Sequence, residues 1–80
     1  MSGGALLADL DRAIVAAHAQ GNNPALAHLY HQAGQHFLAN GQTDRAGFFL
    51  TQAYVLALDC GDTARASVLW HWLKADGRER

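Results

Sequence analysis

Residues 27–60 read AHLYHQAGQHFLANGQTDRAGFFLTQAYVLALDC, and this stretch decides the fold. Apolar residues recur in it at intervals of three and four, in two runs separated by Asn40-Gly41-Gln42-Thr43. This spacing is typical of helices that each bury one face. Because the connection is short, the two helices are expected to be antiparallel neighbours.

The first run places Gly34 in the middle of its apolar face, which consists of Leu26, Leu29, Tyr30, Ala33, Gly34 and Phe37. A glycine inside a helix costs about 1 kcal/mol relative to alanine. Its position on the buried face therefore predicts that a neighbouring helix approaches closely at Gly34.

The second run has one apolar stripe made of Ala46, Phe49, Leu50, Ala53 and Ala57. Further apolar residues fall on its other sides, namely Phe48, Val55, Leu56 and Leu58. A helix that is apolar on most sides is expected to be packed on most sides.

The flanking sequence predicts one more helix on each side of this hairpin. Asn23 with Pro24 marks a helix start, and Gly61 with Asp62 marks a helix end followed by a new start. We expect one all-α domain over residues 1–80, with four antiparallel helices at about residues 4–20, 24–40, 43–59 and 62–75.

The hairpin resembles a tetratricopeptide repeat, a helical unit of about 34 residues. The residues at the positions that the family's pattern uses are, in order, Tyr30, Ala33, Gly34, Phe37, Gly41, Ala46, Leu50 and Ala53. The family's proline near the end of the second helix is missing, with Leu58 or Asp59 in its place. The match covers one repeat, under half of the chain. A four-helix bundle unrelated to the repeat family is the alternative.

Composition limits the classes of partner. The formal net charge of −1 provides no basic field for phosphates, so nucleic-acid binding is not expected. Cys60 is the only cysteine, which excludes an internal disulfide and suits a reducing cytoplasm. No apolar run reaches the roughly 18 residues that span a bilayer. We therefore expect a cytoplasmic protein without a membrane partner.

The resemblance implies a binding surface on the outward side of the first hairpin helix, which binds a peptide or protein partner. The residues at these positions are His28, His31, Gln35 and Leu38. They do not form the lysine and asparagine clamp that some family members use for a carboxylate. The alternative interpretation is that they are only the solvated face of an amphipathic helix.

Catalysis and metal binding find little support in the sequence. His28 and His31 lie three residues apart, but two imidazoles do not complete a zinc site, which needs about four ligands. Neither a phosphate-binding glycine loop nor a nucleophile with a paired base occurs. We therefore expect no catalytic residues, no metal and no cofactor.

Three aromatic residues suggest self-association: Phe48, Trp70 and Trp72. The chain contains one repeat with a single helix, half of a repeat, on each side of it. A repeat fold needs more neighbours than this, so we expect a homodimer contact to supply them. The leading hypothesis is a non-enzymatic adaptor that binds a protein partner through the repeat-like groove. The alternative is a small dimeric helical bundle that regulates or senses a ligand or metal.

Overall fold

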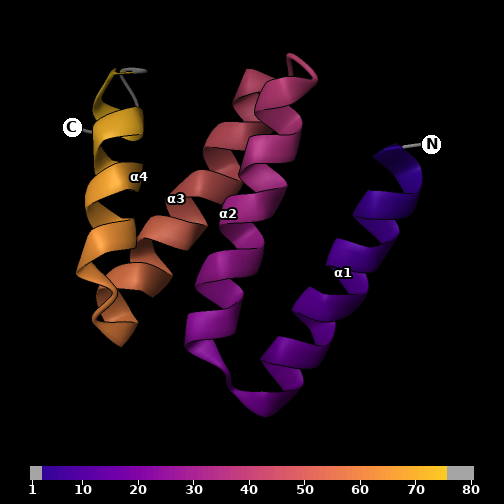
Figure 1. Ribbon diagram of the computed structural model, residues 1–80, viewed down its shortest axis with the longest axis horizontal. Helices are drawn as coiled ribbons and strands as arrows, with labels where there is room; N and C mark the ends of the chain where they lie inside the picture. Colours follow the sequence, from indigo (N-terminus) through magenta and orange to yellow (C-terminus); the bar gives the residue numbers. More distant parts are fainter. Residues whose placement is uncertain (1–2, 76–80) are drawn as a thin grey trace.

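The computed structural model describes residues 3–75 and consists of four helices. These are α1 (Gly3–Gln20), α2 (Asn23–Ala39), α3 (Thr43–Cys60) and α4 (Thr63–Ala75), and no strand occurs among the described residues. Successive helices run in opposite directions (Figure 1). The all-α fold with four antiparallel helices is confirmed, and each helix boundary lies within one residue of its expected place. Residues 1, 2 and 76–80 of the expected domain lie outside the described residues.

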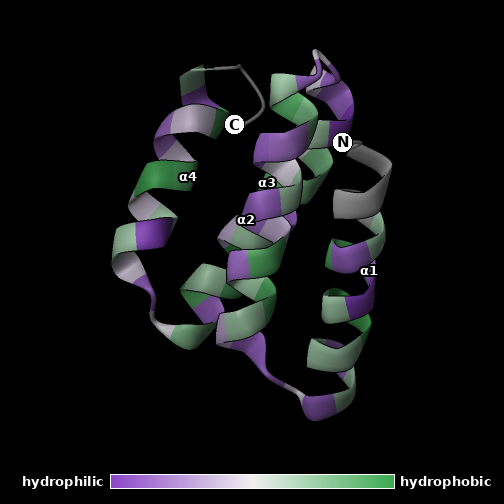
Figure 2. Ribbon diagram, turned by 45° about the vertical axis from the view of Figure 1, so that its right-hand side comes forward, coloured by the Kyte–Doolittle hydropathy of each residue, from purple (hydrophilic) through white to green (hydrophobic). Residues whose placement is uncertain are grey.

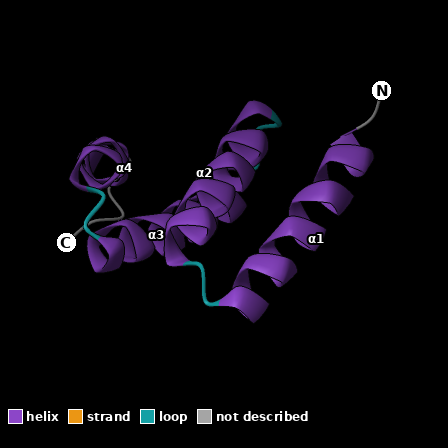
Figure 3. Cartoon of the chain, turned by 60° about the horizontal axis from the view of Figure 1, so that its bottom comes forward, coloured by secondary structure: helices purple, strands orange, loops and turns teal. Residues whose placement is uncertain are grey.

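The α2–α3 hairpin forms the centre of the molecule. Its two helices have the most extensive contact, while α4 packs on α3 and α1 packs on α2. Figure 3 shows α1 set apart from the hairpin and α4 on the opposite side. The main buried cluster joins α2, α3 and α4 through Phe37, Ala46, Leu50, Ala53, Leu69 and Leu73. The hairpin thus supplies the framework on which the outer helices are placed.

Gly34 allows the close approach of α2 and α3. A Cβ atom added at this residue would lie 2.5 Å from both Cγ and Cδ2 of Leu50 and 3.5 Å from the carbonyl oxygen of Ala46. Leu50 is only 2% exposed, so its side chain occupies this buried space. The expectation of a close helix contact at Gly34 is confirmed.

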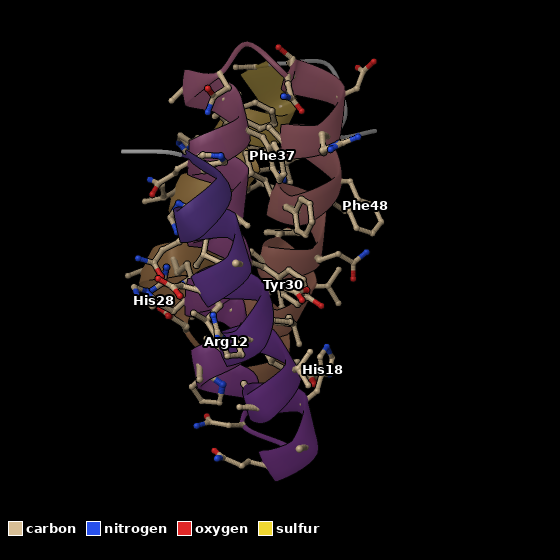
Figure 4. All side chains as sticks on the ribbon, turned by 90° about the vertical axis from the view of Figure 1, so that its right-hand side faces the viewer. Arg12, His18, His28, Tyr30, Phe37 and Phe48 are labelled. Carbon is tan, nitrogen blue, oxygen red and sulfur yellow. The ribbon has the colours of Figure 1, made fainter. Side chains whose placement is uncertain are left out.

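The outer side of α3 is open to solvent. Phe48, Val55 and Leu58 are 60%, 55% and 56% exposed, respectively. Figure 4 shows Phe48 pointing away from the hairpin, whereas Phe37 lies between α2 and α3. The expectation that α3 is packed on most sides is therefore wrong. The arrangement of the four helices leaves this side of α3 uncovered. Figure 2 shows hydrophobic and hydrophilic residues mixed along the helices.

Capping residues fix the ends of the helices. Asn22, and not Asn23 as expected, caps α2, because its side-chain oxygen accepts a hydrogen bond of 3.2 Å from the backbone N–H of Ala25. Asp62 caps α4 as expected, accepting from the backbone N–H of Arg65 at 3.1 Å. Gly61 ends α3 in the left-handed conformation with φ 78°, which a glycine adopts without strain.

The contact of α1 with α2 includes a polar link. His18 Nε2 lies 3.1 Å from the Tyr30 hydroxyl, and the Tyr30 ring stands 5.9 Å from that of Phe49 on α3. Towards its N-terminus α1 diverges from α2 (Figure 1). Within residues 3–75, no helix combines the length and hydrophobicity needed to cross a membrane.

Candidate functional site

A hollow of about 120 Å³ lies between α2 and α4, with α3 beneath it. Its lining residues are His31, Gln35 and Leu38 from α2, Leu50 from α3, and Val68, Leu69 and Trp72 from α4. Three of the four residues that the sequence placed in a partner-binding groove thus lie together around one cavity. We call this cavity, with its lining residues, the α2–α4 hollow.

The hollow has a buried apolar base and a more accessible edge. Leu50 and Leu69 are 2% and 1% exposed, so they form a fixed apolar base. Val68 is 60% exposed and Gln35 is also exposed, so both can be reached from solvent. This combination offers burial to an apolar group and a hydrogen bond to a polar one at the same place.

His28, the fourth residue of the expected groove, is linked to His31 through Arg65 of α4. Arg65 NH1 lies 2.7 Å from His31 Nδ1, and Arg65 NH2 lies 3.4 Å from His28 Nδ1. In Figure 4, His28 lies on the side of α2 opposite to Tyr30. Arg65 also donates from Nε to Asp62 Oδ2 at 3.1 Å, so the cap of α4 belongs to the same network. We call the contacts of Arg65 with His28 and His31 the Arg65 bridge.

The Arg65 bridge determines the protonation state of His31. A guanidinium has only N–H donors, so the Nδ1 that it contacts at 2.7 Å must supply a lone pair. His31 is therefore neutral in this arrangement, with its proton on Nε2. Burial, followed by the positive charge of Arg65 and then His28, lowers the pKa of His31 below its ordinary value of 6.5.

The acidic member of the network is held in its charged form. The backbone N–H and the side chain of Arg65 both donate to Asp62, and these hydrogen bonds lower the pKa of its carboxyl below the ordinary 3.8. Asp62 therefore stays ionised near neutral pH and balances the charge of Arg65.

Metal ligands do not gather in this region. Across residues 3–75, no group of three His, Cys, Asp or Glu side chains could hold a metal ion. The two Nδ1 atoms of His28 and His31 already face the Arg65 guanidinium. A metal ion at these atoms would have to displace a positively charged side chain.

The three residues expected in a self-association patch occupy different surroundings. Phe48 is 60% exposed on α3, and its ring contacts that of Phe49. Trp70 lines a separate shallow hollow beside Tyr54 and Leu58. Trp72 is half-buried against the main core cluster and lines the α2–α4 hollow. The two tryptophans therefore do not share a surface cavity.

Sequence reasoning missed Arg65 and Val68 as site residues. The repeat period contained a usable signal, because Arg65 follows His31 by 34 residues, about one repeat length. Equivalent positions of neighbouring repeats lie side by side in such arrays. A separation of 34 residues from His31 and from Leu38, two of the expected groove residues, leads to Arg65 and Trp72.

Comparisons with protein-family models, with curated proteins and with solved structures gave no match to this chain.

Proposed function

We propose that this chain is a non-enzymatic protein-interaction module that binds a short peptide segment of another protein between α2 and α4. The observation that carries this proposal is the α2–α4 hollow, which brings His31, Gln35 and Leu38 together with Trp72. The resemblance of the hairpin to a tetratricopeptide repeat supports it, because that family binds partners along the corresponding helix face.

The size of the hollow favours a peptide over a free small molecule. A volume of about 120 Å³ is below the roughly 300–1,000 Å³ of typical small-molecule pockets. It is close to the engineered cavity of about 150 Å³ that holds a single benzene ring. The hollow therefore accommodates one apolar side chain, while the remaining peptide lies along the surface between the helices.

The lining suits this mode of binding. A tryptophan at the wall of a cavity is a frequent source of binding energy, and Trp72 has this position. Gln35 offers an amide donor and acceptor to the peptide backbone, and the Nε2–H of His31 offers a further donor. One apolar anchor with a few polar contacts is the usual composition of a peptide site.

The test is a selection of peptides from a random displayed library on the full-length chain, followed by titration of a synthesised winner. Val68→Asp should weaken its binding about tenfold or more, because a carboxylate at the edge of an apolar hollow loses solvation when the peptide binds. Val15→Asp is the matched control, since Val15 is 61% exposed on α1 and Val68 is 60% exposed on α4. Equal effects of the two substitutions would refute the site.

Self-association is a second proposal, favoured by the uncovered apolar side of α3. Phe48, Val55 and Leu58 share this exposure, and exposed apolar groups of this kind often mark protein contacts. We propose that a homodimer forms through this side of α3, with Phe48 at the contact. Trp70 adjoins this side of α3, because it lines a hollow together with Leu58, whereas Trp72 lines the α2–α4 hollow.

A further inference from the structure

The Arg65 bridge is the only side-chain hydrogen-bonded connection between α2 and α4 that we find among the described residues. It joins helices that are separated by the whole of α3 in the sequence. The same imidazole that accepts from Arg65 NH1 at 2.7 Å also lines the α2–α4 hollow. Any change in His31 therefore acts on the link between the helices and on the hollow at the same time.

We propose that the Arg65 bridge is a proton-operated latch, closed when His31 is neutral and opened when His31 is protonated. We further infer that opening this latch weakens peptide binding in the α2–α4 hollow. The second statement rests on the proposed function, whereas the first does not.

The chemistry of the contact carries the proposal. Protonation adds an N–H to His31 Nδ1, which then has no lone pair for the guanidinium 2.7 Å away. The hydrogen bond becomes a contact between two positive charges and is lost. His28 contacts the same guanidinium at the longer distance of 3.4 Å.

Arg65 keeps one of its present partners when the latch opens. Its Nε donates to Asp62, the cap of its own helix, and this ion pair does not involve α2. Release therefore removes the contacts with α2 but leaves the charge of Arg65 balanced.

The charged and titratable groups around His31 all act consistently. Arg65 from α4 and His28 from α2 both disfavour its protonated form, and burial does so most strongly. The negative charge of Asp62 is balanced by its ion pair with Arg65. Among the described residues of α3, Asp59 is engaged with Asn23, and no charged group of α3 contributes to the pKa of His31.

Opening the latch removes a polar contact at the wall of the hollow and leaves α4 packed in place. Leu69 and Leu73 are buried in the main cluster and hold the later part of the helix. Ala66, next to Arg65, is buried with Ala27 and Ala57 and holds its start. Without the Arg65 bond the imidazole of His31 is less fixed at the wall of the hollow, which raises the cost of ordering the site for a peptide.

The latch is tested by nuclear magnetic resonance on the full-length chain without any peptide. The Nη–H signals of Arg65, whose NH1 contacts His31, and the imidazole signals of His31 are followed between about pH 5 and pH 7.5, a range in which histidine titrates. We expect the two to move with the same midpoint, below 6.5. An Arg65 signal that does not respond while His31 titrates would overturn the latch.

Two matched variants identify the responsible histidine. His31→Gln should remove most of the pH response of Arg65, whereas His28→Gln should leave most of it, because the His31 contact is the shorter one. Both substitutions fall on the solvent side of α2, where His28 is exposed and His31 is half-buried. An unchanged Arg65 response in His31→Gln would overturn the assignment.

Regulation of the hollow is tested separately with the selected synthetic peptide. We expect its affinity to be about three- to tenfold weaker near pH 5 than near pH 7.5, and this difference to vanish in His31→Gln. A latch that titrates while peptide affinity stays constant would overturn the regulation and leave the latch standing. If no peptide binds at either pH, the proposed function and the regulation fail together, and the resonance titration alone decides the latch.

Discussion

Gly34 of α2 and Leu50 of α3 fill one space at the centre of the hairpin. The side chain of Leu50 occupies the volume that a Cβ atom on Gly34 would need, at 2.5 Å from that position. Leu50 also forms part of the base of the α2–α4 hollow. The close approach of the hairpin helices and the shape of the candidate site thus depend on the same pair.

Gly34→Ala should therefore destabilise the protein although alanine is the better helix former. Overpacking a buried site costs about 1–3 kcal/mol. Replacing glycine by alanine inside a helix returns roughly 1 kcal/mol, so the cost of overpacking is larger than this gain in all but its mildest cases. We expect a lower free energy of unfolding in urea and a midpoint of thermal unfolding reduced by about 4–8 °C per kcal/mol lost.

A double-mutant cycle provides the control. Leu50→Ala alone should cost about 2–5 kcal/mol, as for other large-to-small core substitutions. In combination with Gly34→Ala the total should be smaller than the sum, because the added methyl group enters the space that Leu50 leaves. Strict additivity would show that the two residues do not compete for this volume.

The start of α2 gives a second prediction. Asn22→Ala should cost about 0.5–2 kcal/mol, because it removes the side-chain acceptor of the Ala25 N–H. Asn23→Ala removes only a hydrogen bond of 3.3 Å to Asp59 at the surface and should change stability by about 0.5 kcal/mol or less. Urea unfolding of both variants measures the difference. A larger loss for Asn23→Ala would reverse the assignment of the cap.

Much of the fold could be predicted from the sequence because its signals are local. The spacing of apolar residues and the glycines between the helices place all four helices to within one residue. Gly34 on a buried face correctly indicated the close helix contact. Asn22 and Asn23 are equally suited to cap a helix, so residue type could not choose between them.

The remaining features depend on packing between distant segments. Phe48 and Val55 are apolar, yet no helix within residues 3–75 covers them, and periodicity within α3 does not reveal how many neighbours the helix has. His31 was expected at the binding surface, but its bond to Arg65 depends on how α4 is placed beside α2. In the sequence these two residues are linked only by their separation of 34 residues, which equals the period of the repeat family that the hairpin resembles.

The open side of α3 gives a third prediction. Phe48→Ser should change stability by about 0.5 kcal/mol or less, because Phe48 is 60% exposed. The sedimentation coefficient of the wild-type chain should increase with protein concentration. Phe48→Ser should abolish this increase. Trp72→Ala is the less informative variant, since Trp72 packs against the main core cluster and its loss also affects folding. A wild-type chain that stays monomeric at all concentrations would refute the homodimer.

The last prediction concerns the dependence of stability on pH. His31 has a pKa in the folded state below its ordinary value of 6.5, so the unfolded chain binds the proton more readily. Its contribution to stability is complete above pH 6.5 and is lost as the pH falls through the folded pKa. Asp62 does not contribute in this range, because its pKa is lowered from 3.8 and it stays ionised in both states.

Urea unfolding at a series of pH values between about 5 and 8 measures this effect. We expect the free energy of unfolding to decrease towards the acid end in the wild type and to decrease less in His31→Gln. Arg65→Gln should have an intermediate slope, because it removes one cause of the lowered pKa of His31 but leaves its burial. His71→Gln is the control, since His71 is exposed on α4. The same slope in the wild type and in His31→Gln would show that protonation of His31 is not linked to folding.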